Sequence, residues 1–249
     1  MEYIRYIWPG FIEGEHHRVI AERLTAVAKG ELKRLIINMP PRHTKSEFAS
    51  IYFPSWMMGL QPNLKIMQTT HTADLSINFG RKVRNLMDTE EYVKIFQDVN
   101  LAADSKSAGK WQTSKGGEYF AAGVGGAIAG RGADLLIIDD PHSEQDAMSM
   151  NLLDSCYEWY TSGPRQRLQP GGAIVIVMTR WSTMDLTGRL LTRQTELNSD
   201  QWEVIELPAI FEDTEEVLWP EFWKKEELES VKASIPVTKW NAQYQQNPT

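Results

Sequence analysis

The sequence predicts an α/β fold in which a mostly parallel sheet is flanked by helices. Apolar, β-rich runs alternate along the chain with amphipathic stretches, which is typical of parallel strands joined by helices. The 249 residues, 42% hydrophobic and 24% charged, suffice for one large α/β domain or for one domain with a small appendage. No internal repeat or low-complexity tract interrupts this pattern.

The first part of the chain predicts a helix, a buried strand and a second helix. Residues 16–29 form the first helix, because their apolar side chains recur on one face and Gly30 follows the last turn. The apolar run 34–39 predicts a strand that is buried on both faces. A loop and a helix that starts near Lys45 follow it.

Residues 65–207 continue the alternation. Strand 65–70 leads into a helix whose apolar residues fall at helical spacing over 75–86, and residues 111–122 indicate a hairpin that turns at 115–117. A glycine-rich stretch over 123–132 precedes the next strand. The remaining expected elements are strand 134–139, helix 144–160, strand 173–179, helix 185–194 and strand 202–207.

The C-terminal residues differ in composition. From about Phe211 the chain is acidic, rich in tryptophan and without a strand pattern. We therefore expect a core over 1–210 and a small helical subdomain or connector over 211–249. The tryptophans there, Trp219, Trp223 and Trp240, are expected to form its core.

Composition narrows the function only slightly. A net charge of −7 argues against a surface made mainly for gripping DNA. No apolar run approaches the roughly 20 residues that span a bilayer, so a cytoplasmic location is the default expectation. The single cysteine, Cys156, excludes an intramolecular disulfide and is expected to be buried as a small hydrophobe.

The strongest local motif is the segment 39–46, Met-Pro-Pro-Arg-His-Thr-Lys-Ser, between a buried strand and a helix. Backbone N–H groups at such a junction bind anions, a lysine there reaches terminal phosphates, and the next hydroxyl ligates magnesium. Met39 and Thr44 occupy the two glycine positions of the motif. A β-branched threonine is poor at φ > 0, so the loop takes a different path or bears strain. The alternative is a simple turn with a solvated Lys45 and a capping Ser46.

A second motif is the acidic end of strand 134–139, where Asp139 and Asp140 follow four apolar residues. Ligands of open α/β sheets bind at this edge, and two adjacent acids there repel each other and lose solvation. A metal ion explains the first acid and a general base that orients water explains the second. The alternative is an exposed turn, since Asp-Asp-Pro is good turn chemistry.

Four segments together resemble the ATPase domain of tailed-bacteriophage large terminase subunits. They are 35–47, 130–141, 178–181 and 244–248, in the family's order and approximate spacing over nearly the whole chain. The resemblance implies a P-loop NTPase fold of the ASCE/RecA-like type with a small C-terminal helical lid. It also implies a motor that uses ATP and Mg²⁺ to drive double-stranded DNA into a procapsid. The implied partners are DNA, the portal protein, the small terminase subunit and a ring of copies, usually five, in the host cytoplasm. The family's nuclease domain would begin where this chain stops.

The resemblance also assigns roles to residues of this chain. Lys45 and Ser46 match the phosphate-binding lysine and the magnesium-binding hydroxyl, and Asp139 matches the metal-holding acid. Asp140 takes the position of the catalytic acid, which is usually glutamate, and Arg42 matches a basic residue that contacts the terminal phosphate. The expected nucleotide contacts are Pro41, Arg42, His43, Thr44, Lys45, Ser46, Glu47 and Arg180.

Other expected roles leave alternatives open. Thr179 and Arg180 match a coupling motif that senses the state of the nucleotide. A ring ATPase takes an arginine from its neighbour. In the family this arginine can lie shortly before the acidic strand, where Arg131 stands. Arg81 and Arg84 are the alternatives, although a solvated helix face explains both of them more simply. The alternative for Arg131 is a loop arginine that bonds carbonyls, and the alternative to Asp140 as the base is Glu144. His16 and His17 either stack near the adenine or are exposed.

Two other functions compete with the motor. Residues 139–142, Asp-Asp-Pro-His, also resemble the acidic box of a superfamily 2 helicase, but 110 residues after Asp139 are too few for a second motor lobe. The missing glycines favour a degenerate P-loop domain that serves as a docking module. Hydrolysis that depends on Lys45 separates an ATPase from such a module.

Overall fold

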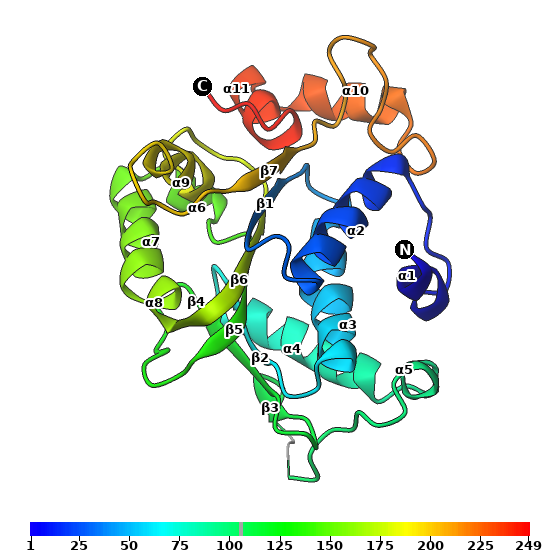
Figure 1. Cartoon of the computed structure of the whole chain (residues 1–249). Coiled ribbons are helices and arrows are strands. Elements are labelled where there is room, and N and C mark those ends of the chain that lie inside the picture. Colours follow the sequence, from blue (N-terminus) through cyan, green and yellow to red (C-terminus); the bar gives the residue numbers. More distant parts are fainter. Residues whose placement is uncertain (105–106) are drawn as a thin grey trace.

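The computed structural model describes residues 1–104 and 107–249, and their core is a single sheet (Figure 1). The strands are β1 Arg34–Asn38, β2 Lys65–Thr70, β3 Lys110–Gln112, β4 Glu118–Gly123, β5 Ala133–Asp139, β6 Leu168–Met178 and β7 Glu203–Glu206. Their order is β3-β4-β2-β5-β6-β1-β7. Every neighbouring pair is parallel except β3 and β4, which form the predicted hairpin. The predicted α/β class is confirmed.

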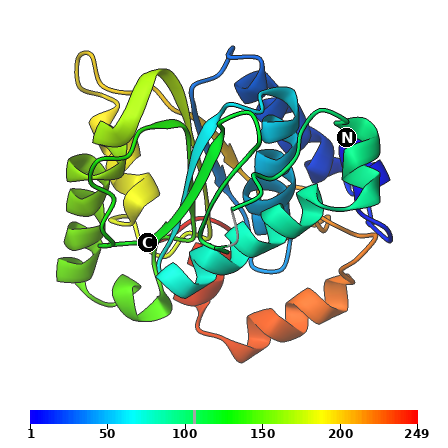
Figure 2. The ribbon, with the colours of Figure 1, turned by 90° about the horizontal axis from the view of Figure 1, so that it is seen from below.

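Helices cover both faces of this sheet, as Figure 2 shows from below. The first face carries α2 (Glu15–Ala28), α3 (Phe53–Leu60) and α4 (Ala73–Met87), and the second carries α7 (Met150–Ser162) and α9 (Leu186–Arg193). Each face has its own apolar cluster. Because the strands are covered on both sides, residues such as Ile36, Ile37 and Ile137 are fully buried, as their continuous apolar runs predict.

Eight further helical elements complete the part of the chain that the structure describes, most of them six residues or shorter. They are α1 Glu2–Ile7, η1 Glu47–Tyr52 (a π-helix), α5 Glu90–Ile95, α6 Glu144–Ala147, α8 Pro164–Arg167, α10 Lys225–Ser234, α11 Val237–Lys239 and η2 Trp240–Tyr244 (a π-helix). The sequence did not predict α1 and α5, because six residues hold fewer than two turns of periodic pattern.

Two predicted boundaries were wrong. The expected helix 144–160 is two helices, because Ser149 leaves the helical conformation at φ −128° and ψ 111° and the chain restarts at Met150. The expected strand 173–179 begins at Leu168, where polar and glycine residues hide its start, and it ends at Met178. Cys156 is buried as expected, and burial raises the pKa of its thiol to about 12.

The C-terminal helices build a third apolar cluster, around Ala209, Leu228 and Trp240. Trp223 packs against this cluster as expected. Trp219 does not: its indole lies against the histidine rings of α2, and the expectation that it belongs to the subdomain core was wrong. The division of the chain at residue 210 stays a prediction. Among the described residues no helix is both long enough and apolar enough to cross a bilayer.

The fold brings three strand ends together at one edge. Strand β6 lies between β1 and β5, and all three run in the same direction. Their registers pair Asn38 with Met178 and Asp139 with Val177. The loop after β1, the acids at the end of β5 and the residues after β6 therefore meet at the carboxyl edge of the sheet, where open α/β sheets bind ligands.

Candidate functional site

The loop that follows β1 is strained at the position the sequence predicted. Thr44 has φ 69° and Arg42 has φ 62°, both in the left-handed region that favours glycine. Met39, at the other glycine position, simply continues the strand, since its N–H donates to the carbonyl of Met178 at 3.1 Å. The loop therefore follows a tight path that is unfavourable for the β-branched Thr44. Helical backbone begins at Lys45.

Lys45 and Asp140 form an ion pair across the strand ends. The Lys45 ammonium lies 2.9 Å from Oδ2 of Asp140, and the lysine side chain is only 8% exposed. The other oxygen of Asp140 accepts the backbone N–H of Thr179 at 2.8 Å. Thr179 also donates its hydroxyl to the Met39 carbonyl at 3.2 Å. Residues after β1, β5 and β6 are thus joined in one polar network.

Asp139 is held from both sides by serines of one helical segment. The Ser46 hydroxyl donates to Oδ1 of Asp139 at 3.0 Å, and the Ser50 hydroxyl donates to Oδ2 at 2.6 Å. Gln68 of β2 donates to the Ser50 oxygen at 3.0 Å. Sequence reasoning missed Ser50 and Gln68. The spacing of four residues between Ser46 and Ser50, one helical turn, was the available signal.

Burial is the largest single influence on the pKa values of Asp139 and Lys45. Burial raises the pKa of the Asp139 carboxyl to about 7, and the neighbouring Asp140 charge adds to this, while Lys45 and the two serine hydroxyls oppose it. Burial opposes the charge of Lys45, but the carboxylates of Asp140 and Asp139 outweigh that cost, so the lysine pKa is raised. Lys45 is thus a buried cation held by two carboxylates, and a bound polyanion would compete with those carboxylates for its ammonium group.

A cavity of about 660 Å³ opens over this loop. Its floor includes Arg42, Lys45 and Ser46, and Arg42 is exposed to it. Its walls are aromatic and come from both ends of the chain. They are formed by Trp8, Phe11, Trp219, Phe222 and Trp223. A charged floor beneath apolar walls suits a ligand with an anionic tail and a flat apolar head. Sequence reasoning missed the part that residues 8–12 take in this cavity.

The three histidines near the loop are all buried. His16 and His17 are 2% and 0% exposed, so of the two alternatives for them, the exposed one was wrong. His43 turns inward, donating from Nδ1 to the Pro41 carbonyl at 2.8 Å and stacking on Trp223. Burial lowers the pKa of His16 to about 4, of His17 to about 3 and of His43 to about 4.

The other predicted site residues lie in different places. Arg131 comes before β5, at the opposite edge of the sheet from Asp139, where it pairs with Glu118 at 3.0 Å and its guanidinium lies 3.9 Å from the centre of the Phe120 ring. Arg180 is bound by Asp185 at 2.9 Å and by Glu206 at 3.2 Å.

The structure also places the alternatives. Glu144 forms an ion pair with Lys239 of α11, while Asp140 forms its ion pair with Lys45 of the loop. Arg81 lies exposed on α4, and Arg84, partly exposed, donates to Asn85. Glu47, half-buried, lines the 660 Å³ cavity beside Ser46.

The side-chain oxygens of this site fit a magnesium ion that takes some of its other ligands from a bound phosphate. Ser46 and Asp139 offer one hydroxyl and one carboxylate within hydrogen-bond distance of each other. No group of three or more His, Cys, Asp or Glu side chains within residues 1–104 and 107–249 could hold a metal unaided. Magnesium usually takes one or two carboxylates and completes its shell with water and substrate phosphates, so this donor set matches it.

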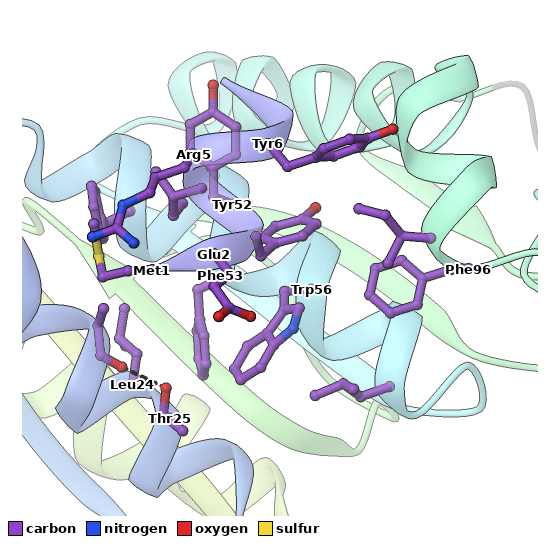
Figure 3. Close-up of a pocket in the computed structure, with 16 residues that line it drawn as sticks. Met1, Glu2, Arg5, Tyr6, Leu24, Thr25, Tyr52, Phe53, Trp56 and Phe96 are labelled. Atoms are coloured by element: carbon purple, nitrogen blue, oxygen red, sulfur yellow. Dashed lines mark hydrogen bonds between the residues drawn. The ribbon is translucent and has the colours of Figure 1, made fainter. Parts of the chain in front are cut away.

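A larger cavity, of about 830 Å³, lies away from these groups (Figure 3). It is enclosed by α1, α2, α3 and the aromatic side chains of Tyr52, Trp56 and Phe96. Its charged members, Glu2 and Arg5, belong to α1. It contains no paired acid and no phosphate loop, so size alone does not make it the reactive site.

The chain resembles known proteins in its structure. No protein-family model and no curated protein matches the sequence. The crystal structure of the HK97 bacteriophage large terminase aligns with a TM-score of 0.62 and 13% identity, over 98% of this chain and 54% of that one. The chain has the fold of a large-terminase ATPase domain. It therefore has a P-loop fold, as predicted.

Two further structures agree with this assignment. An ATPase-domain mutant of the Thermus phage P74-26 large terminase aligns with a TM-score of 0.60 and 12% identity, over 100% of this chain and 98% of that one. The large terminase of a thermophilic bacteriophage in complex with ATP-γ-S aligns with a TM-score of 0.51 and 8% identity, over 88% and 50%. Our chain thus spans about half the length of the HK97 large terminase.

Proposed function

We propose that this chain is the ATPase motor domain of a viral large terminase, coupling hydrolysis of Mg-ATP to translocation of double-stranded DNA into a procapsid. The observation that carries the proposal is the meeting of Lys45 and Ser46 with Asp140 and Asp139 at one sheet edge. A phosphate loop, a metal-holding acid and a second acid are the parts that ATP hydrolysis requires. Similarity to a terminase ATPase domain, and to a large terminase solved with ATP-γ-S, supports the choice of nucleotide.

Nucleotide binding would rearrange the Lys45–Asp140 pair. The β- and γ-phosphates carry more negative charge than one carboxylate, so they compete for the lysine ammonium. Asp140 then loses its cation but keeps the Thr179 N–H on Oδ1. This leaves Oδ2 of Asp140 free to accept a proton from an attacking water, which makes Asp140 the base. Glu144 is less suited, because it pairs with Lys239 on the C-terminal helices.

Ser46 and Asp139 would hold the magnesium ion. When bound, the ion would neutralise charge on the phosphate oxygens and favour attack on the terminal phosphoryl group. Ser50 and Gln68 keep the Asp139 carboxylate oriented from the side opposite Ser46. Arg42, exposed on the loop and lining the cavity, would contact the terminal phosphate.

Arg131 fits a role in a neighbouring subunit. Strand β5 separates it from Asp139, and seven residues of strand span about 20 Å. Its guanidinium would therefore not reach a nucleotide bound at the phosphate loop of its own chain. Supplied to the next subunit of a ring, it would neutralise charge in the transition state. The pair with Glu118 would have to open for this to happen.

The assembly and its location follow from the resemblance to terminases. The proposed partners are double-stranded DNA, the portal protein, the small terminase subunit and further copies in a ring, in the host cytoplasm. Thr179 and Arg180 would couple the nucleotide state to the C-terminal segment, because the Arg180 N–H donates to the side chain of Gln246 at 3.1 Å. The nuclease activity of a complete large terminase is not part of this proposal.

The test is magnesium-dependent release of phosphate from ATP by the purified chain, with Lys45→Ala as the comparison. We expect slow turnover that Lys45→Ala abolishes while the fold is retained, as circular dichroism would show. Absence of turnover together with absence of nucleotide binding would favour the docking-module alternative. Turnover that survives Lys45→Ala would exclude this site as the ATPase centre.

A further inference from the structure

We propose that His17 is a positioning residue that holds the phosphate loop in shape where the motif lacks its glycine. The inference rests on the proposed nucleotide-binding function. Thr44 occupies the glycine position directly before Lys45 and adopts φ 69°. A β-branched residue rarely adopts this conformation, and it persists only where the surroundings impose it.

The hydrogen bonds at Thr44 identify what imposes it. The Gly14 N–H donates to Nδ1 of His17 at 2.8 Å. Nδ1 is therefore the acceptor nitrogen, and in the neutral ring the proton lies on Nε2. Nε2 lies 2.7 Å from the Thr44 hydroxyl oxygen, so it donates to that oxygen, and the hydroxyl in turn donates to the His43 carbonyl at 2.5 Å. The directed chain runs from Gly14 through His17 and Thr44 into the loop.

The His17 ring cannot move away from this position. It stacks on Phe48 with a centroid distance of 5.0 Å and an interplanar angle of 11°, and Phe11 and Trp219 meet it edge-on at 4.8 and 5.0 Å. The ring is fully buried. Gly14 is needed for this packing, since a Cβ there would lie 2.7 Å from Trp219. A rigid hydrogen-bond donor is needed to keep the Thr44 backbone in its strained conformation, because a mobile partner would let the loop relax.

The consequence concerns the affinity for nucleotide. Relaxation of Thr44 toward negative φ would rotate the peptide that joins it to Lys45, and would move the backbone N–H groups that cradle phosphate. His17 never touches the ligand in this scheme. It acts only through Thr44, and a glycine at position 44 would not need it, because glycine adopts φ > 0 without strain.

This dependence gives a test with internal controls. The probe is a non-hydrolysable fluorescent ATP analogue with magnesium, and the readout is its dissociation constant. We expect His17→Phe, which keeps an aromatic ring between Phe11, Phe48 and Trp219, to weaken binding of the analogue about tenfold. Thr44→Val, which keeps the shape and removes the hydroxyl, should weaken it by a similar factor. In a Thr44→Gly background, adding His17→Phe should change the constant by less than about twofold.

The outcomes distinguish this inference from the proposed function. Equal weakening by His17→Phe in both backgrounds, or wild-type affinity in Thr44→Val, would overturn the role of His17. If the wild-type chain bound no nucleotide, the proposed function would fail instead. In that case a double-mutant cycle of unfolding with His17→Phe and Thr44→Val still decides: coupling between the two supports the pair, and additivity refutes it.

Discussion

Replacing Ser50 with alanine should separate magnesium binding from folding. The Ser50 hydroxyl is fully buried and donates a hydrogen bond of 2.6 Å to Oδ2 of Asp139. Its removal leaves a buried carboxylate oxygen without a donor, and a hydrogen bond to a charged group contributes about 1.5–3 kcal/mol. That energy corresponds to a loss of roughly 10- to 100-fold in any equilibrium that requires an ionised Asp139.

The cost to folding should be much smaller. Burial already raises the pKa of Asp139 to about 7, so the carboxyl can take up a proton near neutral pH at a cost of no more than about 1 kcal/mol. Protonation relieves the unpaired charge in the folded protein but removes the metal ligand. We therefore expect the free energy of unfolding to fall by only about 1 kcal/mol, while the magnesium concentration for half-maximal nucleotide binding rises at least about tenfold.

The assay is a magnesium titration of nucleotide binding, alongside urea unfolding. Ser55→Ala is the matched control, because Ser55 is equally buried but bonds Tyr3 and the Tyr52 carbonyl, away from the acids. A normal magnesium dependence in Ser50→Ala would refute the account of Asp139 as a metal ligand that Ser50 supports. A similar shift in Ser55→Ala would reduce the effect to general destabilisation.

Three other predictions can be checked with the same material. Asp140→Asn should bind nucleotide but lower kcat at least about 100-fold, because the amide is a far weaker base; single-turnover kinetics that remain normal would remove Asp140 from the chemistry. Arg131→Ala should bind nucleotide yet lose turnover, and mixing it with Lys45→Ala subunits should restore part of the activity; no restoration in any ratio would argue against an arginine supplied in trans. Burial lowers the pKa of His16, His17 and His43 below the value of about 6.5 expected in the unfolded chain, so the unfolded state binds more protons below pH 6.5 and the free energy of unfolding falls on acidification. Asp139, with its raised pKa, partly offsets this loss. We expect urea unfolding to show a net loss of about 2 kcal/mol between pH 7.5 and 5.5, and an unchanged or rising free energy of unfolding would contradict the prediction.

The sequence predicted the sheet well because its strands are buried on both faces. Continuous apolar runs such as Leu135–Ile138 leave little choice of structure, and the motifs at their ends then fall at one sheet edge. The strain at Thr44 was also predictable, since only the glycine preference of the motif was needed. The short helices and the start of β6 were not, because they carry too few periodic residues.

The supporting residues of the site were beyond sequence reasoning for a different reason. His17, Trp8 and Trp219 reach the loop from distant parts of the chain, and nothing local marks a residue whose partner lies far away in sequence. Ser50 was closer to prediction, one helical turn after Ser46. Polar residues on a helix are usually solvated, and only the position of Asp139 shows that this one is not.

A structure of the chain with magnesium and ATP-γ-S would test the central claim most directly. The account predicts that the Lys45 ammonium leaves Asp140 for the terminal phosphates, and that Ser46 and Asp139 lie beside the metal at the same sheet edge. A nucleotide bound elsewhere, or a Lys45 that stays 2.9 Å from Asp140 with the phosphates beyond its reach, would contradict it.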